Sequence, residues 1–95
     1  MHYRVRTYDF NSERFDDMMA YADSIKDQVR NIEGLNFSHV CRTSETGAVI
    51  VAQNDNEEAM EDATPRFREI MVGMAQFFTS PPNPVGAEVI WQSDH

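Results

Sequence analysis

The sequence is short of several features on which whole classes of protein depend. Its single cysteine, Cys41, cannot form an internal disulfide, and a free thiol is typical of a reducing compartment, so we expect a cytoplasmic protein. No run of about 18 apolar residues occurs, which excludes a transmembrane helix. Basic residues are few, 8 against 16 acidic ones, and the net charge of −8 repels phosphate groups. We therefore expect neither nucleic acid nor an anionic membrane as a partner.

Common catalytic and metal-binding motifs are also missing. The four glycines are isolated from one another, so the chain has no glycine-rich phosphate loop, and it has no nucleophile elbow. A metal site needs clustered histidine, cysteine or carboxylate ligands. His2 and His39 are expected on strands that a third strand separates. We therefore predict no metal and no cofactor.

At the centre of the chain, residues 34–55 have the pattern of a β-hairpin. Two runs rich in β-compatible residues, Leu35–Thr43 and Ala48–Gln53, flank a polar segment that ends in Gly47. If Thr43 pairs with Ala48, alternation divides the side chains between two faces. One face then carries Phe37, His39, Cys41 and Ile50, and the other carries Val40, Val49 and Val51. Because both faces are substantially apolar, we expect something to cover each of them.

Helical patterns flank the hairpin on both sides. Apolar residues at spacings of three and four predict one helix from Ser12 to Ile32, capped by Asn11 or Ser12 and followed by Gly34 at positive φ. After the hairpin, Asn56 offers a second cap. Thr64-Pro65 predicts an interruption, with a short helix over Glu57–Ala63 and a longer one over Pro65–Phe78. Gly73, within the longer helix, would admit a close neighbour: a strand, a ligand or another helix.

Strand-like segments stand at both ends of the chain, over Tyr3–Phe10 and Val85–Gln92. Arg4 and Arg6 share one face of the first segment. That face is either solvated or partly buried against carboxylates, and Glu88 is the candidate partner if the two terminal strands pair.

The element order β-α-β-β-α-β predicts an α+β, ferredoxin-like sandwich in which residues 1–95 form one domain. Its antiparallel sheet has the strand order 4-1-3-2, with both helices on one face. The other face is expected to carry Val40, Val49, Val51 and Ile90. Strand alternation does not decide which face the helices cover, so the assignment can be inverted, and inversion would place His39 in the dimer interior. Because an exposed apolar sheet favours association, we predict a homodimer in which two such faces pack together across a two-fold axis.

The chain resembles the dimeric α/β barrel superfamily, in particular the antibiotic-biosynthesis-monooxygenase-like domains. The resemblance spans the whole chain. The resemblance is based on five segments: the terminal strand Tyr3–Phe10, the Glu33–Phe37 entry to the hairpin, the Thr46-Gly47 turn, the Thr64-Pro65 kink and the Pro81-Pro82 connector. The resemblance implies cofactor-free oxygenases, haem-degrading enzymes or lactone isomerases as possible relatives. Haem-degrading members use a histidine on the second helix, and residues 57–78 contain none, so haem binding of that type is not expected.

His39 is the candidate catalytic residue, because a histidine among apolar neighbours can donate or accept a proton. The alternative is a hydrogen-bonded structural histidine. The apolar residues of the second helix form either core or one wall of a ligand cleft against the sheet. The predicted ligand-binding residues are Phe37, His39, Cys41, Phe67, Met71, Met74 and Trp91.

Two functions follow from this reading, and a stress-response or regulatory dimer with no bound metabolite is a third alternative. The first is binding of a small hydrophobic molecule, fatty-acid-like or aromatic polyketide-like, between the helices and the sheet. The second is a cofactor-free monooxygenase or isomerase acting on such a molecule, since these reactions need only a base, an anion stabiliser and a dry pocket.

Overall fold

The computed structural model describes residues 1–94, and His95 lies outside the described residues. Four antiparallel strands form one sheet in the order β2-β3-β1-β4. The strands are β1 (His2–Asp9), β2 (Leu35–Arg42), β3 (Gly47–Asn54) and β4 (Asn83–Glu88). This is the predicted ferredoxin-like α+β fold, and the strand order is the predicted 4-1-3-2 read from the opposite edge.

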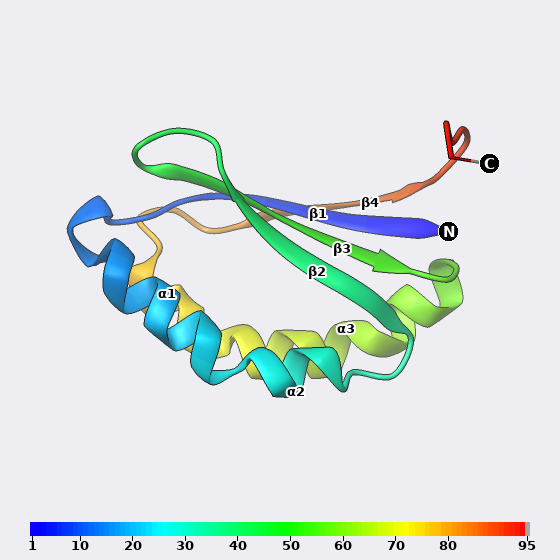
Figure 1. Ribbon diagram of the computed structural model, residues 1–95, viewed down its shortest axis with the longest axis horizontal. Coiled ribbons are helices and arrows are strands. Elements are labelled where there is room, and N and C mark those ends of the chain that lie inside the picture. Colours follow the sequence, from blue (N-terminus) through cyan, green and yellow to red (C-terminus); the bar gives the residue numbers. More distant parts are fainter. Residues whose placement is uncertain (95) are drawn as a thin grey trace.

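The helices all lie on one side of the sheet, and in the described chain no helix covers the other face (Figure 1). The α-helices are α1 (Phe15–Ser24), α2 (Lys26–Arg30) and α3 (Glu57–Met71). Two 3-10 helices complete the layer, η1 (Ser12–Arg14) before α1 and η2 (Val72–Phe77) after α3. We call the uncovered side of the sheet the bare face.

The first helical region differs from the single helix predicted over Ser12–Ile32. It begins as a 3-10 turn, in which Asn11 Oδ1 accepts a hydrogen bond from the Glu13 amide, so the predicted cap is confirmed. It then breaks at Ile25, which has φ −105° and ψ 2°. The Ser24 hydroxyl donates to the carbonyl of Tyr21 at 2.6 Å, and such a side-chain bond competes with the helical ladder.

The predicted interruption at Thr64-Pro65 is wrong, because α3 runs without a break through Pro65. The N-cap at Asn56 is confirmed, since its Oδ1 accepts from the Ala59 amide at 2.8 Å. Four side chains at helical spacing, Met60, Ala63, Phe67 and Ile70, are buried on either side of the proline. Their burial keeps the segment helical, although proline removes one backbone hydrogen bond.

The last strand is shorter than the predicted Val85–Gln92. Its partner β1 begins at His2, and the final bond of the ladder joins the Val89 amide to the Met1 carbonyl. No further residue of β1 remains to pair, so Ile90 and Trp91 lie beyond the sheet. They are 91% and 78% exposed, and Ile90 is not part of the sheet face on which it was predicted.

The hairpin register is shifted by one residue from the predicted pairing. Thr43 donates to Gly47 across a three-residue loop, so Val40 pairs with Ile50, and Cys41 with Val49. A shift of one residue turns every side chain of a strand to the opposite face. Val40 therefore lies on the helix side, while His39 and Cys41 lie on the bare face with Val49 and Val51. The predicted grouping of Phe37, His39 and Cys41 with Ile50 is wrong.

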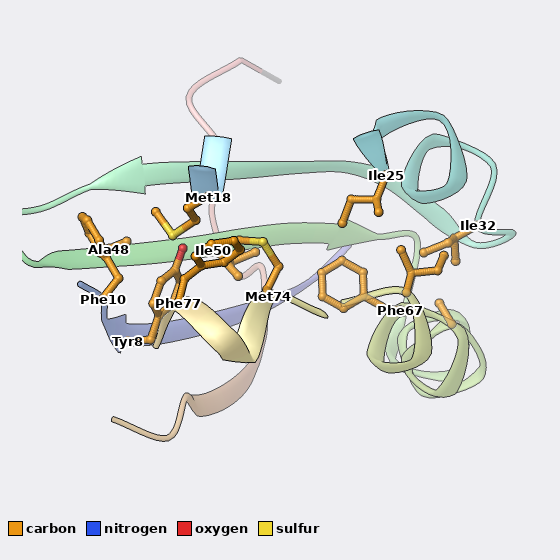
Figure 2. Packing of buried hydrophobic residues seen from close by; sticks show 12 residues of the cluster. Tyr8, Phe10, Met18, Ile25, Ile32, Ala48, Ile50, Phe67, Met74 and Phe77 are labelled. Atoms are coloured by element: carbon orange, nitrogen blue, oxygen red, sulfur yellow. The ribbon is translucent and has the colours of Figure 1, made fainter. Parts of the chain in front are cut away.

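The hydrophobic core fills the space between the sheet and the helices (Figure 2). Alternate residues of β3 point into it, with Ala48, Ile50 and Ala52 each 4% exposed. At the other end of β3, the Asn54 side chain donates to the Gly34 carbonyl at 2.6 Å. Gly34 has φ +86°, as predicted, which lets the chain turn from α2 into β2.

Candidate functional site

The structure brings three of the predicted ligand residues, Phe37, Met71 and Met74, to one cavity of about 430 Å³ and places the others elsewhere. Phe37, His39 and Cys41 come from β2 and lie on the bare face, where Phe37 stacks on His39 with ring centroids 4.5 Å apart. Tyr3 of β1 meets Phe37 edge to face at 6.2 Å. The sequence predicted the side chains of these β2 residues, Phe37, His39 and Cys41, in the cleft between helices and sheet. The shifted register places them on the opposite face of the sheet.

The predicted residues of the second helix do lie on the helix side, but two of them belong to the core. Phe67 is 5% exposed and Met74 is fully buried (Figure 2). Met71 is half-buried and lines two cavities between the helices and the sheet. Trp91 lies in the segment after β4, away from these cavities.

A cavity of about 310 Å³ lies where the end of α3 and η2 meet β1, β3 and the segment leading into β4. Its walls are largely apolar and come from Ile50, Met71, Val72, Ala75, Phe78, Pro82 and Pro84. Three guanidinium groups also line it, those of Arg4, Arg6 and Arg68. We call it the arginine cavity.

Strand alternation brings two of these arginines to the helix side. Arg4 lies opposite Ala52 on β3 and Gly86 on β4, and Arg6 lies between Ile50 and Pro84. Both arginines are half-buried there, whereas Arg68 on α3 is exposed.

Arg4 is held by the helix above it. Its Nη2 donates to the Thr64 hydroxyl at 3.2 Å, and that hydroxyl donates to the Met60 carbonyl at 2.6 Å. The Nε of Arg4 is buried and has no hydrogen-bond partner in the described chain. Such an unpartnered donor costs stability unless another group supplies an acceptor.

Arg6 is the residue of this cavity whose pKa is shifted most clearly. Its guanidinium lies over the ring of Phe67, 4.6 Å from the ring centroid. Burial, the larger cause, and repulsion from Arg4 and Arg68 together lower the pKa of Arg6 to about 10. The positive charges of this cavity therefore destabilise one another.

No carboxylate neutralises these arginines within residues 1–94. The ion pairs of that range are Arg14–Asp17 and Arg66–Glu69, neither of which lines the arginine cavity. The predicted partner Glu88 pairs across the ladder with His2 and forms no ion pair with any other residue that the structure describes. An acidic protein thus gathers three unpaired cations beside an apolar pocket, an arrangement that can hold an anion.

A second cavity of about 430 Å³ lies between α1–α2 and the edge strand β2. Its apolar lining includes Ile25, Val29, Val40 and Met74, and its charged residues, Asp23, Lys26 and Arg30, are exposed. We call it the β2-edge cavity. It lacks a half-buried charged side chain of the kind found at Arg6.

Sequence reasoning identified the arginine pair of β1 but missed Arg68. A signal for it was present, because Thr64, Arg68, Met71 and Ala75 recur at spacings of four, three and four. That spacing makes a second stripe along α3 and into η2, beside the buried one. These four residues line the arginine cavity or the small hollow next to it.

Comparison with solved structures identifies the fold. A protein of unknown function from Nitrosomonas europaea, NE2512, superposes with a TM-score of 0.78 at 11% identity, over 97% of this chain and 91% of that chain. A structure named antibiotic biosynthesis monooxygenase gives 0.73 at 11% identity, over 95% and 99%. The monooxygenase ActVA-Orf6 of Streptomyces coelicolor, in complex with Nanaomycin D, gives 0.71 at 19% identity, over 97% and 92%.

The fold is that of the antibiotic-biosynthesis-monooxygenase-like proteins. This confirms the resemblance inferred from the sequence. No family model and no curated protein sequence matches the chain. At such low identities the antibiotic-biosynthesis-monooxygenase-like likeness concerns the fold, and the arginine cavity is a feature observed in this chain.

Two further observations concern metal binding and membrane-spanning helices. Within residues 1–94, no three histidine, cysteine, aspartate or glutamate side chains gather where a metal ion could bind. No helix in the same range is long and apolar enough to cross a bilayer.

Proposed function

We propose that this protein binds a small hydrophobic molecule, fatty-acid-like or aromatic polyketide-like, in the arginine cavity. The observation that carries the proposal is a largely apolar cavity of about 310 Å³ at which polar groups from two elements converge. Ligand pockets are mostly apolar with a few placed polar groups, and their volumes start at roughly 300 Å³. The Nanaomycin D complex of ActVA-Orf6 supports the proposal, because a protein of this fold there holds a small molecule.

The arginine cavity is preferred over the larger β2-edge cavity on chemical grounds. A ligand that enters it meets Ile50, Met71 and Phe78 on its walls and a half-buried Arg6. The charged groups of the β2-edge cavity are exposed and keep their hydration without a ligand. A half-buried guanidinium in the arginine cavity therefore gives orientation and specificity a physical source.

The test uses the neutral fluorescent dye phenylnaphthylamine with two filling variants. Ala75→Phe places a ring in the arginine cavity, and Ala22→Phe does the same in the β2-edge cavity. We expect Ala75→Phe to weaken binding about tenfold or more and Ala22→Phe to leave it within about twofold, since each lost apolar contact costs roughly 1 kcal/mol. Loss of binding in Ala22→Phe alone, or in neither variant, would contradict the proposal.

A second candidate is a cofactor-free monooxygenase or isomerase. The unpaired cations favour it, because a guanidinium beside an apolar pocket can stabilise a phenolate or enolate that forms on a bound substrate. His39 lies on the other face of the sheet, so its catalytic role would require a site built on the bare face. Oxygen uptake with anthrone tests this function: Arg6→Met should lower the rate, and an unchanged rate in His39→Ala would remove His39 from the mechanism.

We also propose a homodimer formed through the bare face. That face carries Val5 of β1, Val49 and Val51 of β3 and Val85 of β4 beside the aromatic pair Phe37–His39. Valines on an uncovered sheet favour association with a second copy, which abolishes their contact with water. A cytoplasmic location stays our expectation, on the basis of the free thiol of Cys41.

A further inference from the structure

We propose that the ligand of the arginine cavity carries a carboxylate, and that Arg6 and Arg68 bind this group while the apolar walls hold the rest of the molecule. The inference rests on the proposed function, because it assumes that a ligand occupies this cavity. It adds the chemical class of that ligand: an apolar acid with one charged end.

The first argument is the charge that the fold leaves without a partner. Two half-buried guanidinium groups, Arg4 and Arg6, and the neighbouring Arg68 line one cavity, while the chain carries 16 acidic residues. Burial of like charges costs stability, and folded proteins normally pair such groups. With so many carboxylates in the sequence, the fold still places none in ion-pair contact with these arginines within residues 1–94.

The second argument is the geometry of the donors. Phe67 lies against the guanidinium of Arg6, and within the described chain neither Arg6 nor Arg68 donates a side-chain hydrogen bond. A guanidinium with an aromatic ring at its face keeps its N–H groups for a partner in its own plane. A carboxylate is planar and accepts two such bonds side by side, which makes arginine the preferred residue for it.

The third argument is the division of the cavity between polar and apolar walls. Ile50, Met71, Phe78 and Pro82 offer hydrocarbon surface, and none of the acidic side chains of residues 1–94 lines the cavity. A small inorganic anion would leave these walls without contacts, and a polyanion would be repelled by the net charge of −8. A ligand with an apolar body and a single carboxylate can contact the hydrocarbon walls with its body and the arginines with its charged group.

The test compares two dyes that differ by one negative charge. Anilinonaphthalene sulfonate and phenylnaphthylamine share their aromatic skeleton, and only the first carries an anionic group. We expect the anionic dye to bind at least about tenfold more tightly, because hydrogen bonds to charged groups contribute roughly 1.5–3 kcal/mol. Added salt should weaken the anionic dye and leave the neutral dye unchanged.

Three arginine variants locate the effect. Arg6→Met and Arg68→Met should each weaken the anionic dye about tenfold and leave the neutral dye within about twofold. Arg66→Met is the matched control, because Arg66 lies on the same helix, pairs with Glu69 and does not line the cavity. It should leave both dyes unchanged. An equal loss of the anionic dye in Arg66→Met would indicate general surface charge and overturn the inference.

Competition with fatty molecules identifies the carboxylate. Decanoate should displace the anionic dye from wild-type protein, and decanol at the same concentration should not. Binding of both dyes without preference, or equal displacement by decanol, would overturn the inference and leave the proposed function standing. If neither dye binds, the proposed function itself is overturned.

Thermal unfolding separates binding from a structural role of Arg6. Because Arg6 is repelled by its neighbours, Arg6→Met should melt at the same temperature as wild type or higher, while Met keeps the hydrocarbon stem over Phe67. Decanoate should raise the melting temperature of wild type and not that of the variant. A lower melting temperature of Arg6→Met, together with unchanged binding in Arg68→Met, would make these arginines structural and contradict the inference.

Discussion

Tyr8 combines full burial of its ring with a hydroxyl that has no hydrogen-bond partner in the described chain. The residue is 4% exposed, and its ring packs against Phe78 with centroids 4.2 Å apart. Burial raises the pKa of Tyr8 above its ordinary value of 10, since the charged phenolate would lose its hydration. The hydroxyl therefore contributes a desolvation cost, whereas the ring contributes packing.

Replacing Tyr8 by Phe should increase the free energy of unfolding by up to about 1–2 kcal/mol, because it removes a buried and unpaired polar group. Urea denaturation at neutral pH measures this change. The matched control is Tyr3→Phe, whose hydroxyl accepts from Gln53 at 2.8 Å, and it should lose about 1 kcal/mol. A loss of stability in Tyr8→Phe would contradict the assignment of an unpartnered hydroxyl.

The same residue predicts a pH dependence. Above its ordinary pKa of 10, Tyr8 ionises in the unfolded chain before it does so in the folded protein. The unfolded state then binds fewer protons, so stability falls as the pH rises through that region. Wild type should lose more stability than Tyr8→Phe in this range, which parallel denaturation curves would reveal.

At the scale of elements, the contact between α1 and η2 depends on Gly73. A methyl group at Gly73 would collide with the hydroxyl and ring of Tyr21 on α1. Tyr21 also packs near Phe77 of η2, with ring centroids 6.1 Å apart. The sequence predicted a strand, a ligand or another helix as the close neighbour of Gly73. In the structure this neighbour is another helix, α1.

Gly73→Ala should therefore destabilise the protein by about 1–3 kcal/mol, although alanine is the better helix former, because the close-packed ring has to move. Chemical denaturation measures the loss. In a Tyr21→Ala background the same substitution should cost less than about 0.5 kcal/mol, since the obstacle is gone. An equal cost in both backgrounds would show that Tyr21 is not the cause.

At the scale of the whole molecule, the hairpin register decides which residues can meet a second copy. The sequence predicted Val40, Val49, Val51 and Ile90 at the dimer interface. Val49 and Val51 lie on the bare face, whereas Val40 lies on the helix side and Ile90 beyond the sheet. The proposed interface therefore gains His39 and Cys41 from β2.

We expect Val51→Lys to convert the protein to a 10.9 kDa monomer, because an interface that buries a lysine charge loses several kcal/mol. Sedimentation velocity at micromolar concentration measures the mass. Val40→Lys is the matched control on the same hairpin and should leave the dimer intact. A wild-type monomer, or dissociation by Val40→Lys alone, would contradict the proposed interface.

Much of the fold could be predicted because its signals are local. Asn11 and Asn56 cap helices through their own side chains, and Gly34 takes the positive φ that few other residues adopt. The element order then allows few compact topologies, and the observed sheet is the expected one. Pro65 misled the prediction because its effect is also local, while the buried residues on both sides of it kept the helix continuous.

The sequence by itself determined the order of strands and helical regions and which side chains of one strand share a face, but not where each helix breaks or where the last strand ends. Only the tertiary structure decided on which side of the sheet each set lies, because a loop of three residues instead of four turns the whole of β2 over. That choice moved His39 to the bare face. The arginine cavity likewise exists only in three dimensions, since Arg4 and Arg6 meet Arg68 across about sixty residues of chain through the packing of α3 on β1.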